Sequence, residues 1–410
     1  MENVSSSNGL EKRPKLRFPG FDEPYRTTLL GDIASLVNRT DPKSNAPIMM
    51  LSAGNGFIMQ SEKYSRDNAG QSLKKYILLK QGELAYNHGA SKAKQFGCCY
   101  ELTEPEARIP YVYHCFKINE DEYTPYVAMA LNNTKMDQQL KRLVSSSVRM
   151  DGLLNISFED YMSVTLHLPS FIEQKHIADF LTKLDERIAY QERLITSLKK
   201  YKRGVIQHIF RSSHTLIKRS QWQQVRLGDI FKKVSRRNTN GKIKNVITNS
   251  AEYGLIPQRD FFDKDIAVDG NTSNYYVIEE GDFVYNPRKS NNAPFGPFNR
   301  YTLSEQGIIS PLYTCLVLQA NINPSYLAWY FKSDAWHRYI YDNGSQGVRH
   351  DRVSMTDNLL MGIPVIYPER KIQDSIANTL DLIESRLHLA QNKLDLLNIE
   401  RNGFMQQLFI

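Results

Sequence analysis

The tetrapeptide Leu30-Gly31-Asp32-Ile33 occurs again as Leu227-Gly228-Asp229-Ile230, 197 residues later. Two further motifs recur at offsets of 200 and 199 residues: Val148-Arg149-x-Asp151 as Val348-Arg349-x-Asp351, and Ile209-Phe210 as Leu408-Phe409. A nearly constant offset over this distance indicates that one fold is duplicated in tandem. Between these anchors the two halves diverge strongly, which favours a protein that binds two related but unlike targets.

Length and composition set limits on the protein class. The chain has 410 residues, a net charge of +8 and four cysteines, and its pI is about 9.0. The basic excess is compatible with a polyanionic partner but does not by itself require one. We expect Cys115 and Cys315, which occupy matching positions in the two halves, to be buried core thiols of a reducing cytoplasm. No apolar run is long enough to span a membrane, no signal-peptide core is visible, and the Ser/Asn-rich residues 1–9 are expected to be disordered.

The strongest structural pattern follows Pro169, where apolar residues recur at alternating spacings of four and three. The pattern lasts nearly five heptads and returns 199 residues later, and its members are Ile177, Leu181, Leu184, Ile188, Gln191, Ile195, Leu198, Lys202, Val205 and Ile209, then Ile376, Leu380, Ile383, Leu387, Ala390, Leu394, Leu397, Arg401, Phe404 and Leu408. This period predicts a coiled-coil seam on two helices of about 40 residues, each roughly 60 Å long. Ser170 and Glu173 predict a capping box at the start of the first helix.

Because each predicted helix follows a homologous globular unit, we expect an antiparallel pair with one globular unit at each end. The residues predicted to carry the pairing are Leu184, Ile188, Ile195, Leu198, Ile383, Leu387, Leu394 and Leu397. Polar side chains interrupt the seam at Gln191, Lys202 and Arg401; they mark either exposed layers or positions that select the register or contact another subunit. Gly204 and Gly403 suggest either close approach by another element or inheritance from one ancestral glycine.

The remaining sequence predicts two mixed α+β domains. Strand-like runs at 75–80, 113–117, 282–285 and 313–318 alternate with turns, and helices are expected from Pro125 and Pro324. Tyr25 and Trp222 are expected to anchor the entry of each domain. The predicted organisation is an N-terminal tail (1–19), a first domain (20–169), a first helix (170–210), a linker (211–221), a second domain (222–367) and a second helix (368–410).

Two loops in each half carry side chains suited to nucleic acid. His88, Lys92 and Lys94 follow one predicted strand, and Arg288, Lys289 and Asn291 follow its counterpart. Basic side chains suit phosphate contact, and amides and guanidinium groups suit base edges. The Ser/Gly-rich stretches ending in Arg149 and Arg349 could present guanidinium forks to DNA, or each arginine could pair with the aspartate two residues later.

Catalytic signatures are missing from the sequence. Gly54-Asn55-Gly56 continues to Met59, where a dinucleotide-binding loop requires a third glycine. Asn286-Pro287 is followed by Arg288, not by the aromatic residue that would hold a flipped adenine beside a methyl donor. No phosphate-binding loop and no metal-ligand spacing among the nine histidines is present. We therefore expect no catalytic residues and no metal site.

With these features together, the chain resembles the specificity subunit of type I restriction-modification systems, known as the HsdS family, over nearly its whole length. The matching residues are the run Leu16 to Phe21 before Tyr25, the repeated Leu-Gly-Asp-Ile element, and Leu168-Pro169 with Glu173-Gln174 and Ile177 at the start of the first helix. The start of the second helix departs from the family pattern, because Pro368-Glu369-Arg370-Lys371-Ile372-Gln373 stands there.

The resemblance implies a non-catalytic, cytoplasmic subunit that reads double-stranded DNA. Each globular half would be a target recognition domain for one half of an asymmetric, bipartite site. The paired helices would set the gap and dock two methyltransferase subunits, with restriction/translocase subunits joining for cleavage. S-adenosylmethionine, ATP and Mg would be bound by those partners and not by this chain. Two alternatives stay open: a coiled-coil scaffold that binds only proteins, and a nucleic-acid enzyme whose site is not recognisable.

Overall fold

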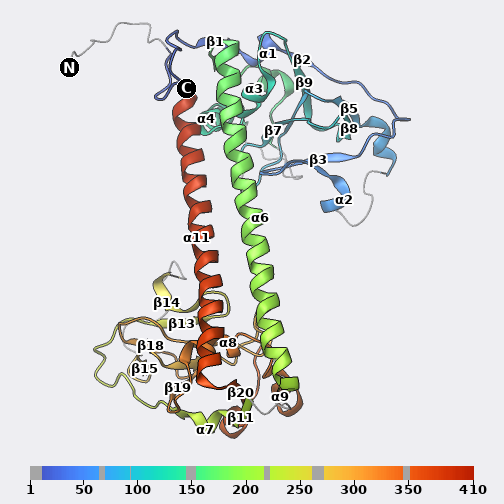
Figure 1. The fold of residues 1–410 in the computed structure, drawn as a ribbon. Helices are drawn as coiled ribbons and strands as arrows, with labels where there is room; N and C mark the ends of the chain where they lie inside the picture. Colours follow the sequence, from blue (N-terminus) through green and yellow to red (C-terminus); the bar gives the residue numbers. More distant parts are fainter. Residues whose placement is uncertain are drawn as a thin grey trace, which may run out of the picture. The chain divides into compact units, whose positions relative to one another are not determined.

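The computed structural model describes residues 12–63, 70–92, 94–144, 154–216, 222–260, 272–344 and 351–410. The chain forms two compact units (Figure 1). Unit 1 contains residues 1–191 together with 393–410, and unit 2 contains residues 192–392. The expectation of disorder for residues 1–9 lies outside the described residues.

Unit 1 is built from short antiparallel sheets and short helices. Its four-stranded sheet has the order β2-β9-β6-β7. The strands of this sheet are β2 (Ala34–Leu36), β9 (His114–Ile118), β6 (Leu84–Asn87) and β7 (Cys98–Glu101). Three two-stranded sheets accompany it: β1 (Arg26–Leu29) with β10 (Thr165–Leu168), β3 (Met49–Ser52) with β4 (Gly56–Met59), and β5 (Ile77–Lys80) with β8 (Glu106–Ile109). The helices of the domain are α1 (Leu30–Ile33), α2 (Gln60–Lys63), η1 (Gly70–Lys75), α3 (Thr124–Ala130), α4 (Thr134–Leu143) and α5 (Phe158–Met162).

Unit 2 repeats the sheet plan of unit 1. Its four-stranded sheet has the order β12-β19-β16-β17, with β12 (Phe231–Lys233), β19 (Thr314–Leu318), β16 (Phe283–Tyr285) and β17 (Phe298–Arg300). The two-stranded sheets are β11 (Trp222–Arg226) with β20 (Pro364–Pro368), β13 (Ile247–Ser250) with β14 (Gly254–Pro257), and β15 (Tyr276–Ile278) with β18 (Gly307–Ile309). The helices are α7 (Leu227–Ile230), η3 (Gln258–Asp260), α8 (Pro324–Phe331), α9 (His337–Asn343) and α10 (Asp357–Met361). The tandem duplication and the mixed α+β class are therefore confirmed.

Two long helices complete the fold: α6 (Phe171–Leu216) and α11 (Arg370–Leu408). Inside unit 1 the start of α6 packs on the end of α11, since the rings of Phe180 and Phe404 meet edge to face at 4.9 Å. Inside unit 2 the end of α6 lies beside the start of α11, where Lys202 Nζ donates to Glu384 Oε2 at 2.7 Å. Within each unit the helices are therefore antiparallel, as the sequence predicts (Figure 1).

The phenylalanine of each repeated Ile/Leu-Phe motif packs into a domain core. Phe409 stacks on Tyr126 of α3 with ring centroids 5.0 Å apart, and Phe210 packs against Tyr326 and Tyr330 of α8 at 5.7 Å. Phe210 is fully buried. The repeated Ile/Leu-Phe motif thus joins each domain to the closing turns of the helix that follows the other domain in the sequence.

The predicted seam lies on the covered face of both helices. Leu184, Ile195, Ile383 and Leu397 are buried, and Ile188, Leu198, Leu387 and Leu394 are partly buried. The two basic interruptions, Lys202 and Arg401, make equivalent ion pairs across the helix pair. Arg401 binds Asp185 within unit 1 through both oxygens, one of them at 3.1 Å, as Lys202 binds Glu384 within unit 2. This arrangement agrees with the register-selecting alternative, because a one-residue slip would separate both pairs.

A glutamine one turn into each long helix fixes the preceding strand. Gln174 Oε1 accepts from the Tyr123 N–H at 2.9 Å, and its Nε2 donates to the Pro169 carbonyl at 3.0 Å. Gln373 makes the same two bonds to Asn323 and Pro368, both at 2.8 Å. The unusual start of the second helix therefore keeps the residue that makes these contacts.

Three expectations need correction or refinement. Only half of the capping box forms: the Glu173 N–H donates to Ser170 Oγ at 3.4 Å, but the Glu173 carboxylate binds Arg17, a charged donor that a backbone N–H cannot match. Helix α6 continues six residues into the predicted linker, because residues 211–216 contain no glycine or proline to stop it. Apart from the adjoining residues and the backbone of its own helix, no described atom lies within 4 Å of a Cβ placed on Gly204, so close approach by another element of the described chain does not explain that glycine.

The expected domain-entry anchors and buried thiols are confirmed. Tyr25 is buried at the entry of unit 1, where its hydroxyl donates to the Leu408 carbonyl at 3.3 Å. Trp222 is partly buried against the unit 2 core. Cys98, Cys99, Cys115 and Cys315 are all buried free thiols, and burial raises the pKa of Cys315 to about 12. A thiol with so high a pKa stays protonated and unreactive at neutral pH.

Candidate nucleic-acid interface

The loop that follows β16 has a fixed turn at its start. The Asn286 side chain accepts a hydrogen bond from the Arg288 N–H at 2.9 Å, which forms an Asx turn. Further along, Ser290 and Ala293 exchange backbone hydrogen bonds of 3.0 and 3.1 Å. The loop backbone is therefore set by its own hydrogen bonds, in contrast to a solvated and adaptable turn.

Residues 351–353 hold the same loop from its other side. The Lys289 N–H donates to the Asp351 carbonyl at 2.9 Å, and the Val353 N–H donates to the Pro287 carbonyl at 2.8 Å. The side chains of Arg288, Lys289 and Asn291 are all exposed. The loop thus presents two cations and an amide from a rigid backbone, which is what readout of base edges and phosphates needs.

A cluster of buried asparagines places the β13–β14 hairpin against this loop. Asn249 Nδ2 donates to the Val284 carbonyl at 2.9 Å, Asn286 Nδ2 donates to the Asn249 carbonyl at 3.3 Å, and Asn299 Nδ2 donates to Asn249 Oδ1 at 2.7 Å. Gly254 has a φ of 75° where the hairpin turns back, as its counterpart Gly56 has 68° in unit 1. Between hairpin and loop lies an open cavity of about 450 Å³, lined by Thr248, Asn249, Ser250, Ala251, Glu252, Asn286, Arg288, Lys289, Ser290, Asn291, Asn292, Pro297 and Tyr313.

The charges around this cavity favour an anion. Arg288 Nε and Arg352 Nε lie 3.9 and 3.7 Å from Asp351 Oδ2, so one carboxylate faces two guanidinium groups. The Arg288 side chain is 69% exposed, and an exposed contact of this length holds it only weakly. Burial raises the pKa of Tyr313, partly offset by a hydrogen bond with Thr248 and by the two arginines. Its hydroxyl therefore remains a neutral donor and acceptor at the cavity wall.

Unit 1 contains the same scaffold with different side chains. Asn87 Oδ1 accepts from the Gly89 N–H at 2.9 Å, and the Leu154 N–H donates to the His88 carbonyl at 2.9 Å. These bonds match those of Asn286 and Pro287 at an offset of 199 residues. At the turn where unit 2 exposes Arg288, unit 1 therefore has Gly89, so the two units differ in chemistry on one backbone frame.

The predicted basic residues of unit 1 do not act alike. His88 is 6% exposed and packs on His114 with ring centroids 5.0 Å apart, so little of its ring is open to a ligand. Lys94 Nζ donates to the Asn132 carbonyl at 2.6 Å, and burial is the main cause that lowers its pKa; this bond gives it a structural role. Lys92 is exposed and stays a candidate for phosphate contact.

Two predicted arginines lie outside the described residues, and other candidates emerge from the structure. Arg149 and Arg349 stay predictions. Arg352 joins the site because Asp351 holds it beside Arg288, and a signal for it existed in the charged run that ends at residue 352. Tyr253, 61% exposed at the hairpin tip, could not be identified from the sequence, since nothing there shows that the tip adjoins the loop after β16.

In the part of the chain that the structure describes, no helix combines the length and the apolar character that a membrane span requires. Nor does any group of three or more His, Cys, Asp or Glu side chains in those residues have an arrangement that could hold a metal ion.

Comparison with known proteins identifies the fold. No family model matches the chain. The S subunit of a type I restriction-modification system from M. genitalium superposes with a TM-score of 0.56 at 15% identity, covering 97% of this chain and 99% of that one. The chain has the fold of a type I restriction-modification S subunit. A second solved chain, from work on complex assembly and conformational transition of the type I R-M system, has a TM-score of 0.53 at 15% identity and covers 96% of this chain.

Proposed function

We propose that this chain is the DNA-reading specificity subunit of a type I restriction-modification complex. The observation that carries the proposal is the pair of units with one backbone frame and unlike loops. Unit 2 offers Arg288 and Lys289 at the turn where unit 1 offers Gly89 and Ala90. A guanidinium group and a small apolar side chain favour different base edges. The two units would therefore read different halves of an asymmetric, bipartite site.

The chemistry of the complex would belong to partner subunits. This chain would position two methyltransferase subunits, which bind S-adenosylmethionine, and restriction/translocase subunits, which use ATP and Mg. The sequence supports this division because it contains no methyl-donor or phosphate-loop motif. We therefore propose that this chain contributes recognition and geometry and no catalytic residue.

An exposed leucine row on α11 would dock a helix of a methyltransferase subunit. Leu382 and Leu389 in unit 2 are 64% and 66% exposed, and Leu396 and Ile399 in unit 1 are 61% and 66% exposed. The three leucines are seven residues apart, the spacing with which one helix covers another. Exposed leucines at this spacing support a partner helix because a monomer gains nothing by leaving them in water. We expect Leu389→Lys to weaken assembly with the methyltransferase subunit while leaving the stability of the free chain within about 0.5 kcal/mol.

The helix pair would set the gap between the half-sites. Ile206 and Phe210 of α6 are part of the unit 2 core, so an insertion in residues 217–221 should leave the gap unchanged. One heptad added to both helices lengthens the pair by about 10.5 Å, which corresponds to about three base pairs. We expect that double insertion to lengthen the gap by this amount with both half-sites kept.

The decisive experiment is a map of methylated adenines directed by this chain together with its methyltransferase subunit. We expect one bipartite, asymmetric motif with a fixed non-specific gap. Replacement of residues 222–367 by the matching domain of another specificity subunit should change one half-site only. A continuous motif, a palindrome, or a swap that changed both halves would contradict the proposal.

Two neighbouring residues should separate base reading from phosphate contact. Arg288→Ala should cost about 1–3 kcal/mol on the cognate duplex and little on random DNA. Lys289→Ala should weaken binding to all sequences and lower the salt slope by about one. Lys371→Ala, which removes an exposed lysine at the start of α11, is the matched control and should change neither property.

A scaffold that binds only proteins is the second candidate, favoured by the same leucine row. It predicts normal binding of the partner subunit by the wild-type chain and no salt-dependent affinity for DNA. Titration of a random-sequence duplex at several salt concentrations distinguishes the two functions.

A further inference from the structure

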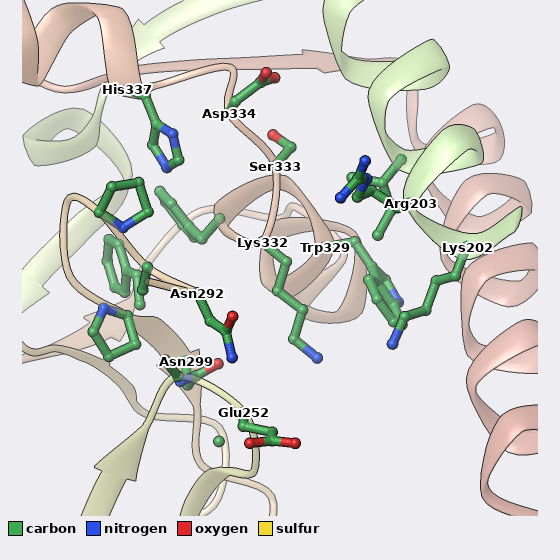
Figure 2. Close-up of a pocket in the computed structure, with 18 of the residues that line it drawn as sticks. Lys202, Arg203, Glu252, Asn292, Asn299, Trp329, Lys332, Ser333, Asp334 and His337 are labelled. Carbon is green, nitrogen blue, oxygen red and sulfur yellow. The ribbon is translucent and has the colours of Figure 1, made fainter. Parts of the chain in front are cut away.

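Unit 2 contains a second cavity, larger than the one beside the β16 loop. Its volume is about 750 Å³, and its walls come from α6, the β13–β14 hairpin tip, the segment 292–299 and the turn between α8 and α9. Figure 2 shows Lys202 and Arg203 on α6 across from Lys332 and Asn292. The cavity is thus lined both by the recognition domain and by the long helix.

The charges lining this cavity leave an excess of cations. Lys202 is neutralised by Glu384 at 2.7 Å, and Asp334 faces Arg211 at 3.8 Å. Three other cations line the cavity, namely Lys199, Arg203 and Lys332. In the described part of the chain none of these three has a salt-bridge partner within 4.0 Å. The carboxylates of the lining are Glu252, Asp334 and Glu384, which are fewer than its four Lys and Arg side chains, so an anionic ligand would meet a net positive surface.

Lys332 is held in place for such a ligand. Its ammonium lies 4.5 Å from the ring centroid of Trp329, and Trp329 is 4% exposed and donates from Nε1 to Asp381 at 2.7 Å. Desolvation of the ammonium by the surrounding protein atoms is the main cause that lowers the pKa of Lys332. Lys202 lowers this pKa further, whereas Glu384 and Asp381 raise it. An anion beside the ammonium would offset the desolvation and favour the charged form of Lys332.

The two cavities are neighbours, because Ala251, Glu252, Asn292 and Pro297 line both. A duplex that reaches Arg288 in the first cavity would continue past the hairpin tip to the second. We propose that the second cavity binds the DNA phosphate backbone beside the half-site read by unit 2, through Lys199, Arg203 and Lys332. This inference rests on the proposed DNA-reading function and adds that α6 itself contacts DNA.

The inference also makes the two units unequal. The helix offset of 199 residues places Asn398 and Asn402 of α11 in unit 1 where Lys199 and Arg203 stand in unit 2. The domain offset of 200 residues, which aligns Tyr126 with Tyr326, places Asn132 at the position of Lys332. Three cations of unit 2 are therefore neutral amides in unit 1. Unit 2 would accordingly bind the DNA phosphate backbone more strongly than unit 1.

The test is the salt dependence of binding by the full chain to a long random-sequence duplex. Lys332→Met removes the ammonium and keeps an aliphatic side chain on Trp329. We expect it to lower the slope of log affinity against log salt by about 0.9, the value for one lost phosphate contact, and to weaken cognate and random DNA by the same factor. Lys332→Arg should keep the wild-type slope. Lys200→Met is the matched control, since Lys200 adjoins Lys199 on α6 but does not line the cavity.

An unchanged slope in Lys332→Met, with normal DNA binding by the wild-type chain, overturns the inference and leaves the proposed function intact. A loss confined to the cognate duplex also overturns it, since that would be base reading. Lower melting temperatures in both Lys332 variants with equal loss of binding would show a structural role. A wild-type chain without DNA affinity would remove the inference and the proposed function together.

Discussion

Replacement of Arg17 by methionine should destabilise unit 1 by about 3 kcal/mol. Arg17 donates to both oxygens of Glu173, from Nε at 2.8 Å and from Nη2 at 2.7 Å. The Glu173 side chain is fully buried, and that of Arg17 is 15% exposed. Removal of one partner of a buried pair leaves an uncompensated charge and costs about 3–5 kcal/mol. We expect the lower end of this range because the pair lies at the protein surface on the arginine side.

The double variant Arg17→Met/Glu173→Met should recover most of this loss. Without the carboxylate no charge remains buried, and replacement of a whole pair by apolar residues is often nearly neutral. The Tyr25 hydroxyl, 3.4 Å from Glu173, keeps its hydrogen bond to the Leu408 carbonyl. The double variant should therefore lie within about 1 kcal/mol of wild type, and the control Lys15→Met, an exposed residue two positions earlier, within about 0.5 kcal/mol.

Urea unfolding followed by circular dichroism, with hydrogen exchange to locate the change, measures these differences. The three tryptophans of the chain, Trp222, Trp329 and Trp336, all lie in unit 2. Their fluorescence therefore reports on unit 2 and serves as an internal reference for changes in unit 1. A loss below about 1 kcal/mol in Arg17→Met, or a double variant no more stable than the single one, would refute the reasoning that a buried carboxylate depends on this arginine.

Three further predictions concern stability. Gly204→Ala should raise the free energy of unfolding by about 1 kcal/mol, since no described atom apart from the adjoining residues and the backbone of its own helix lies within 4 Å of the new Cβ; a drop in melting temperature would contradict this. Burial lowers the pKa of His114 below its usual 6.5, so below about pH 6.5 the unfolded state takes up a proton that the folded state resists, and stability falls with falling pH. His114→Gln should make that fall less steep in urea titrations at pH 5 to 7, and an identical pH slope would count against it. Asn249→Ala leaves the buried Val284 carbonyl without its 2.9 Å donor and should lower the free energy of unfolding by about 2 kcal/mol. Urea unfolding followed by tryptophan fluorescence measures this change, and a variant as stable as wild type would disprove the prediction.

The sequence could predict the parts of this protein that depend on periodicity and repetition. A seven-residue apolar repeat marks one face of a helix whatever surrounds it, so the covered positions Leu184 and Ile383 could be identified without a structure. The strands β9 and β19 could also be predicted from the sequence, because turns flank both of them. The duplication followed from constant offsets alone.

The structure was needed wherever a side chain's role depends on neighbours that are distant in sequence. His88 and Arg288 follow equivalent strands and are both polar, yet His88 is buried and Arg288 lies in solvent. The reason is that His88 occupies the turn position of Pro287, whereas Arg288 occupies the next position, which is Gly89 in unit 1. Glu173 binds Arg17, 156 residues away, and not the cap of its own helix. Lys332 and the α6 residues Lys199 and Arg203 line one cavity although they are far apart in sequence. Local spacing determines helices, strands and repeats, but burial and charge pairing are properties of the three-dimensional neighbourhood, and that neighbourhood is set by the tertiary fold.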